Sequence, residues 1–202
     1  EDLDRSIGAI NTVVNKSGKL FGYNTDVPGF LWALKDALGF NPETKTVLVL
    51  GAGGAARAAV FALARAGADK IFILNRTPER AEGLLAYLAP HFPETEMELL
   101  GSPEAAPGEK IDLVVNASAC GMAANDPAAF DLKNLKKETP VYDLVYSPAE
   151  TKLLKAARER DWPRANGLGM LAAQAAISFH LWTGEKDAVR ETMLETLKQC
   201  HF

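Results

Sequence analysis

The sequence predicts an α/β protein built around a doubly wound, parallel β-sheet. Three observations lead to this fold class. Short, continuously apolar runs alternate with helical segments, as expected when strands are buried on both faces of a parallel sheet. A glycine-rich turn joins the first of these runs to an alanine-rich helix. The 202 residues, of which 48% are apolar and 24% charged, are enough to bury a substantial core.

The chain begins with a predicted β-hairpin followed by a helix. Residues 9–14 and 19–23 are expected to be extended, with the sequence Asn-Lys-Ser-Gly at 15–18 as the turn between them. From Val27 onward, apolar residues recur at helical spacing until Gly39, which is a typical helix stop. This pattern predicts a helix over residues 27–39.

Five strands are expected in the parallel sheet, with two helices after it. The strands are predicted at residues 46–50, 70–74, 97–100, 111–116 and 140–145. An alanine-rich helix that ends at Ala66 follows the first strand. Beyond Gly167, helices are predicted over 168–183 and 185–199.

Composition and charge exclude several classes of function. The formal charge of −4 provides no field that would gather nucleic acid or an anionic membrane. Basic residues between 152 and 164 are mixed with acids, which predicts a solvated helix face. Cys120, Cys200 and the three histidines lack metal-ligand spacing, so we expect no metal and a cytoplasmic protein. The longest apolar run, 168–182, is shorter than the ~20 residues of a membrane span.

Gly51, Gly53 and Ala56 have the spacing G-x-G-x-x-A between a strand and a helix. Gly51 permits the tight turn, Gly53 lets backbone N–H groups approach a pyrophosphate, and the small Ala56 allows close helix packing. The helix N-terminus then directs its partial positive charge toward the phosphates. The pattern predicts a dinucleotide-binding, Rossmann-like domain, with a purely structural turn as the alternative.

The strand at 70–74 is followed by Asn75 and Arg76, where many dinucleotide sites carry an acid that binds both ribose hydroxyls. A guanidinium group instead suits a 2′-phosphate, and Arg80 can reach the same side if the turn enters a helix. Asn75 and Thr77 add polar contacts, and Thr77 can cap that helix. We therefore predict NADP as the cofactor, with a solvated surface role for Arg76 as the alternative.

Seven segments occur in order along the chain. They are IGAINTVV, GYNTDVPGF, GAGGAARA, NRTPERA, VVNASACGM, YDLVYSPAETKLL and NGLGMLAAQAAISFHLWTG. Together, over essentially the whole chain, they resemble the shikimate dehydrogenase family. The resemblance implies an enzyme of aromatic amino-acid biosynthesis, on the chorismate pathway, that reduces 3-dehydroshikimate to shikimate with NADPH. Its active site would lie in a cleft between an N-terminal substrate domain and a C-terminal cofactor domain.

The resemblance also implies roles for individual residues. Asp26 would be the carboxylate of a catalytic lysine–aspartate pair and would contact the substrate. Asn11 and Gln174 would bind substrate hydroxyls, and Tyr146 would reach the substrate carboxylate. Contacts to NADP would come from Gly51, Ala52, Gly53, Gly54, Ala55, Asn75, Arg76, Thr77, Arg80, Leu144, Gly167 and Met170, the last beside the nicotinamide.

The residues with implied roles also have structural alternatives. Asp26 precedes a helix and could be only its cap. Asn11 could satisfy backbone groups of its hairpin, whereas Gln174, inside an apolar helix, needs a partner if it is buried. Tyr146 could be an aromatic residue at the end of the sheet, and Met170 a core residue.

In the family, a Ser-x-Ser motif and the catalytic lysine precede the segment IGAINT, and residues 1–7 contain neither. We therefore expect 1–26 to be a remnant of the substrate domain and 27–165 the NADP domain, with 27–39 as a linking helix. Residues 166–202 would be helices that pack back toward the cleft. Such an N-terminally truncated chain would bind NADP better than it turns over substrate. The alternatives are a non-catalytic NADP-binding module and a quinate/shikimate dehydrogenase relative. The expected partner is a small-molecule substrate, with the chain a monomer or homodimer.

Overall fold

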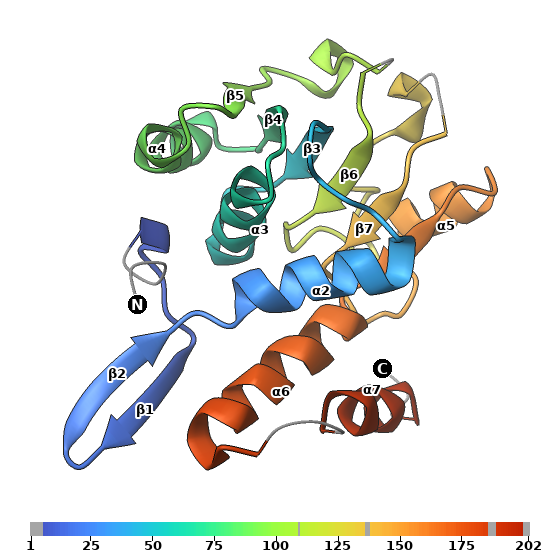
Figure 1. Ribbon diagram of the computed structural model, residues 1–202. Coiled ribbons are helices and arrows are strands. Elements are labelled where there is room, and N and C mark those ends of the chain that lie inside the picture. The colour runs from blue at the N-terminus through green and yellow to red at the C-terminus, as the bar shows by residue number, and fades with distance from the viewer. Residues whose placement is uncertain (1–5, 109, 136–137, 186–188, 200–202) are drawn as a thin grey trace.

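The computed structural model describes residues 6–108, 110–135, 138–185 and 189–199 (Figure 1). It contains a two-stranded antiparallel hairpin and a six-stranded sheet with the order β5-β4-β3-β6-β7-β8. Every pairing in the larger sheet is parallel. This order, in which the chain winds outward in both directions from β3, confirms the doubly wound α/β fold.

The five predicted strands of the large sheet are present, and a sixth accompanies them. The strands are β3 (Thr46–Leu50), β4 (Lys70–Leu74), β5 (Glu96–Leu99), β6 (Leu113–Asn116), β7 (Val141–Asp143) and β8 (Arg164–Asn166). The sequence did not predict β8, because its three residues are exposed or half-buried and form no apolar run. It is held instead by parallel pairing to β7 at the sheet edge.

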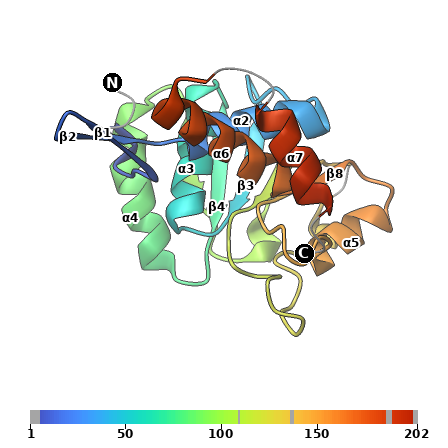
Figure 2. The ribbon, with the colours of Figure 1, turned by 90° about the horizontal axis from the view of Figure 1, so that it is seen from below.

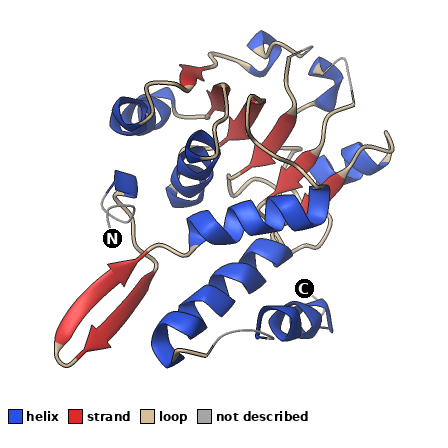
Figure 3. Ribbon diagram, in the orientation of Figure 1, coloured by secondary structure: helices blue, strands red, loops and turns tan. Residues whose placement is uncertain are grey.

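Helices cover both faces of the sheet (Figure 3). They are α2 (Asp26–Leu38), α3 (Gly54–Arg65), α4 (Pro78–Leu88), α5 (Lys152–Arg158), α6 (Leu168–Thr183) and α7 (Val189–Gln199), with short 3-10 turns η1 (Ala89–His91), η2 (Pro103–Ala105) and η3 (Leu132–Asn134). The predicted boundaries of the helix at 168–183 are confirmed, and Gly39 ends α2 in the left-handed conformation. The helix predicted over 185–199 is described from Val189, and residues 186–188 lie outside the described part.

Alternate strand residues face two apolar layers. Val47 and Val49 of β3 pack with α2, α3 and α4, whereas Leu48 and Leu50 face α5 and the segment at 100–135. Burial on both faces explains why the strand reads as a continuous apolar run. No helix in the described part of the chain is both long and apolar enough to cross a membrane.

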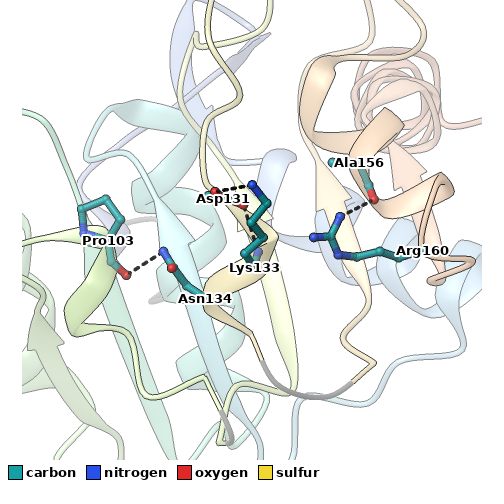
Figure 4. A network of polar contacts seen from close by, with 6 residues as sticks. All are labelled: Pro103, Asp131, Lys133, Asn134, Ala156 and Arg160. Carbon is teal, nitrogen blue, oxygen red and sulfur yellow. Dashed lines mark hydrogen bonds and ion pairs between the residues drawn. The ribbon is translucent and has the colours of Figure 1, made fainter.

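Polar contacts occur in and beside the irregular layer that covers the second face (Figure 4), and one of them joins two separate segments. Asn134 in η3 donates a hydrogen bond to the Pro103 carbonyl in η2 at 3.3 Å. The Asp131 carboxylate accepts from the Lys133 backbone N–H at 3.0 Å, and Arg160 donates to the Ala156 carbonyl at 3.3 Å. The basic residues near α5 are exposed or half-buried, which agrees with the predicted solvated face.

The hairpin projects from one side of the body of the protein (Figure 2), and β1 contacts α6. Strand β1 (Thr12–Lys16) begins and ends later than its predicted segment, 9–14, whereas β2 (Lys19–Tyr23) has the predicted bounds, 19–23. Ser17 and Gly18 at the turn both have positive φ, 52° and 86°, which suits a tight hairpin turn. Immediately before the hairpin, Ile7 is fully buried in the core formed with α2 and α3.

Helices α2 and α6 cross at close range (Figure 1). A Cβ atom at Gly29 of α2 would lie 3.0 Å from both the Cβ and the backbone nitrogen of Gln174 in α6. Further along the pair, a Cβ at Gly169 would meet the Ala33 side chain at an ordinary 3.5 Å. The absence of a side chain at Gly29 therefore allows the two helix backbones to approach there.

Gly29→Ala should lower the free energy of unfolding by about 1–3 kcal/mol, because the added methyl group meets helix backbone that cannot easily move. Gly83→Ala on the exposed face of α4 is the matched control, since nothing lies within 4 Å of its Cβ position. That control should gain about 0.5–1 kcal/mol from helix propensity. Denaturant unfolding of both variants measures the difference, and equal effects would contradict close packing at Gly29.

Candidate functional site

Asn11 and Asp26 meet where the hairpin begins and ends. Asn11 precedes β1, and its backbone N–H donates to the Tyr23 carbonyl at 3.1 Å. The Asn11 side-chain oxygen accepts from the Thr25 backbone N–H at 2.9 Å, and its Nδ2 donates to Asp26 Oδ1 at 2.8 Å. Both ends of the amide are therefore oriented by partners. The Asn11 side-chain oxygen does satisfy a backbone N–H group, as the structural alternative predicted. The side-chain nitrogen of Asn11 instead contacts the Asp26 carboxylate.

Asp26 is not the cap of α2. Its neighbour Thr25 occupies the N-cap position without a side-chain capping bond, and the Asn24 side chain instead accepts from the Val27 backbone N–H at 3.1 Å. Asp26 is half-buried and points to Asn11. The structural alternative for Asp26 is therefore wrong, which leaves its carboxylate available for chemistry.

The pKa of Asp26 is raised above its ordinary value because partial burial disfavours the charged form. The hydrogen bond from Asn11 acts in the opposite direction and offsets part of this effect. A carboxyl group whose pKa moves toward neutrality is better suited to exchange a proton with a substrate. The geometry and the titration of Asp26 thus agree with an acid–base role.

Gln174 reaches the same place from α6. The Thr25 hydroxyl lies 3.3 Å from Gln174 Oε1, while Gln174 Nε2 donates to the Leu171 carbonyl at 3.2 Å. This second bond directs the side-chain oxygen toward Thr25. Three residues predicted to bind substrate, Asn11, Asp26 and Gln174, are therefore linked through one threonine.

Sequence reasoning missed the hydroxyl residues that join this group. Thr12, Thr25 and Ser178 are 2%, 0% and 5% exposed, so they belong to the interior. A signal was present, because each threonine follows an asparagine in a repeated Asn-Thr dipeptide, and Ser178 lies one helical turn after Gln174.

The glycine turn is open at the N-terminus of α3. Gly51 has φ of 113°, and a Cβ there would lie 2.9 Å from the Ala117 carbonyl oxygen, so only glycine fits. Nothing lies within 4 Å of the Cβ positions of Gly53 and Gly54. The helix start has neither a side-chain cap nor an acid in its first turn. Its backbone N–H groups are thus arranged for an anion.

The second part of the predicted cofactor site follows β4. Arg76 and Arg80 are exposed, and neither guanidinium group makes a hydrogen bond or an ion pair within the described residues. Asn75 donates to the Thr77 carbonyl at 2.7 Å and so shapes the turn. Thr77 occupies the N-cap position of α4, but its side chain makes no capping bond. Both guanidinium groups are therefore free for a phosphate.

The remaining predicted residues lie at the ends of β7 and β8. Leu144 is half-buried, and the carbonyl of Leu144 approaches Gly167 so closely that a side chain at Gly167 would collide with it. Met170, in the first turn of α6, is 8% exposed and packs with the core, and its place beside the nicotinamide stays a prediction. Tyr146, three residues beyond β7, is 37% exposed.

A buried carboxylate that sequence reasoning did not single out organises the same edge of the sheet. Asp143, with no exposed surface, accepts hydrogen bonds from Asn116 at 2.8 Å, Thr151 at 2.6 Å and the Val145 backbone N–H at 3.0 Å. Burial raises the pKa of Asp143, and these three donors oppose the shift. The network ties the loops after β6 and β7 to the start of α5.

Comparison with known proteins shows which protein family this chain resembles. The model for "Shikimate / quinate 5-dehydrogenase" matches residues 34–120, and that for "Shikimate 5'-dehydrogenase C-terminal domain" matches 167–198. A shikimate dehydrogenase (NADP(+)) of Geobacillus sp. is 39% identical over 198 residues, which cover 96% of this chain and 71% of the relative. The chain belongs to the shikimate dehydrogenase family.

Two further members of the family are similar. A shikimate dehydrogenase (NADP(+)) of Geobacter sp. is 47% identical over 183 residues, and the match covers 88% of this chain. The chain spans 62% of the length of that relative. The crystal structure of the Thermus thermophilus shikimate 5-dehydrogenase with NADP(H) and shikimate has a TM-score of 0.81 and 37% identity, covering 98% of this chain and 71% of that one.

Family membership agrees with the fold, and the individual residue roles stay predictions. The structure brings Asn11, Asp26 and Gln174 together, and it leaves the glycine turn and both arginines open. Among the described residues, no three histidine, cysteine, aspartate or glutamate side chains are grouped to hold a metal ion.

The raised pKa of Asp26 makes stability depend on pH. The stabilisation of the folded state by protonated Asp26 is fully present below the ordinary aspartate pKa, about 3.9. It is lost as pH rises through the higher folded-state pKa, because the half-buried carboxylate must then be ionised. The Asp26→Asn substitution removes this pH-dependent loss, and the new side-chain oxygen can still accept a hydrogen bond from Asn11. We expect Asp26→Asn to be more stable than the wild type at pH 7, with a gap that narrows toward pH 4.

Denaturant unfolding between pH 4 and pH 8 measures this gap. Asp36→Asn, on the exposed part of the same helix, controls for the loss of one negative charge. A stability difference between Asp26→Asn and the wild type that does not change with pH would contradict the assignment.

Proposed function

We propose that this chain carries the site of an NADP-dependent oxidoreductase that interconverts 3-dehydroshikimate and shikimate. The observation that carries the proposal is the contact of Asp26 with Asn11 at 2.8 Å, with Gln174 reached through Thr25. It places a carboxylate of raised pKa beside two amides that can bind hydroxyl groups. A substrate with several hydroxyls and one oxidisable carbon suits such a site, and relatives named shikimate dehydrogenase support this choice.

The residues present fit NADP. The open N-terminus of α3, with Gly51 to Ala55 around it, is shaped for a pyrophosphate, and Asn75, Arg76, Thr77 and Arg80 would hold the ribose and its 2′-phosphate. Leu144, Gly167 and Met170 would line the nicotinamide. When bound, the nicotinamide accepts or supplies the hydride.

In this proposal the residues of the chain position the substrate and move its proton. Asn11 and Gln174 bind substrate hydroxyls, and Tyr146 binds the carboxylate. Asp26 takes the hydroxyl proton as the carbon is oxidised and returns it in the reverse reaction. The family resemblance implies a lysine, preceding Asn11 in the sequence, that shares this step.

The proposal also includes the division of the chain. Residues 1–26 would belong to the substrate domain and 27–165 to the cofactor domain, with the helices of 166–202 returning to the cleft. The contacts of α6 with both α2 and β1 support this assignment, because they bring the C-terminal part to the substrate residues. Its partner would be a small molecule in the cytoplasm, and the chain would be a monomer or homodimer.

Shikimate-dependent NADP⁺ reduction tests the activity, followed by the absorbance of NADPH for this chain and for a version extended by its upstream reading frame. We expect turnover at least in the extended protein, and a large loss of turnover in its Asp26→Asn variant with unchanged NADP⁺ affinity. The same assay with quinate in place of shikimate shows which of the two substrates the enzyme prefers. NADP⁺ binding without turnover in either form would favour the non-catalytic module.

Arg76→Ala should weaken NADP⁺ binding by about tenfold or more and leave NAD⁺ binding nearly unchanged, because a charge-assisted phosphate contact is lost. Calorimetric titration of both cofactors gives the ratio. Arg65→Ala, in the last turn of α3 and far from the open N-terminus of that helix, is the control for removal of a positive charge. An equal loss for both cofactors would mean that Arg76 does not bind the 2′-phosphate.

A further inference from the structure

Ser178 is the central hydroxyl of the buried cluster and lies one turn beyond Gln174 in α6. Its Oγ donates to the Gln174 backbone carbonyl at 2.9 Å. It also lies 2.7 Å from Thr12 Oγ1 and 3.1 Å from Thr25 Oγ1. Ser178 therefore contacts the hairpin, the start of α2 and its own helix at once.

The contact of Ser178 with Gln174 has one possible direction, because a carbonyl oxygen can only accept, whereas either hydroxyl can donate in the contacts with Thr12 and Thr25. In one complete arrangement, the single proton of Ser178 goes to the Gln174 carbonyl. Ser178 Oγ then has two lone pairs, and the hydroxyls of Thr12 and Thr25 are both within reach to donate to them. With both donors in place, the hydrogen-bonding capacity of Ser178 is complete.

The two threonine hydroxyls have other acceptors nearby, and these are residues of the proposed substrate site. Both lie 3.2 Å from Asn11 Oδ1, and Thr25 Oγ1 lies 3.3 Å from Gln174 Oε1. Asn11 Oδ1 already accepts from the Thr25 backbone N–H and so has one lone pair left. These longer contacts compete with the shorter contacts to Ser178.

We propose that Ser178 is a positioning residue that draws the Thr12 and Thr25 hydroxyl protons away from Asn11 and Gln174, so that both side-chain oxygens stay free to accept from substrate hydroxyls. The inference rests on the proposed function for the identity of the ligand. Without the Ser178 hydroxyl, the buried threonines turn to the remaining acceptors, because an unpaired buried hydroxyl is costly. Each substrate hydroxyl must then displace a bond made within the protein.

The test compares Ser178→Ala with Ser178→Thr, which keeps a hydroxyl able to bond the carbonyl one turn back. Thr183→Ala is the matched control, since Thr183 makes the same kind of bond, at 2.8 Å to the Phe179 carbonyl, on an exposed part of α6. The readouts are the Kd for shikimate with saturating NADP⁺, the Kd for NADP⁺, and the side-chain amide NMR resonances of Asn11 and Gln174 without ligand.

Ser178→Ala should raise the Kd for shikimate about three- to tenfold and leave the Kd for NADP⁺ unchanged. It should also shift both amide resonances, whereas Ser178→Thr and Thr183→Ala stay close to the wild type. Shikimate binding within twofold of the wild type in Ser178→Ala would overturn the inference. If the extended wild type binds no shikimate either, the proposed function fails, and unshifted amide resonances in Ser178→Ala would then overturn the hydroxyl assignment independently.

Discussion

The close crossing of α2 and α6 at Gly29 is the constraint on which the proposed substrate site depends. Because Gly29 has no side chain, Gln174 lies against the backbone of α2 one turn from Asp26. Thr25 and Gln174, 149 positions apart in sequence, come within 3.3 Å of each other. Buried hydroxyls then complete the contact between the elements. Packing and site geometry are therefore controlled by the same residue.

The two carboxyl groups with burial-raised pKa values differ in how completely they are satisfied. Asp143 is fully buried and receives hydrogen bonds from two side chains and a backbone N–H, which suits a structural role in holding the loops after β6 and β7. Within the described residues, Asp26 accepts a side-chain hydrogen bond from Asn11 alone. An ionised carboxylate has room for further donors. This unfilled capacity at a half-buried position separates Asp26 from Asp143 and suits the substrate contact proposed for it.

Prediction from sequence succeeded where one local pattern controls the outcome. Continuous apolar runs located β3 and β4 to the residue, and the apolar stretch between Gly167 and Gly184 located α6. The glycine turn was predictable because Gly51 needs a positive φ that other residues avoid. Strand β8 was not predictable, because its own residues show no strand pattern. It is a strand only through its pairing with β7.

The sequence by itself determined the fold class, the glycine turn and the arginines that suit a 2′-phosphate, because each depends on residues close together in the chain. Its ordered motifs also indicated the family. The tertiary structure decided that Asp26 is no cap and that Thr12, Thr25 and Ser178 meet. These facts depend on the approach of the hairpin, α2 and α6, and no local pattern shows that residues more than 150 positions apart in the sequence meet.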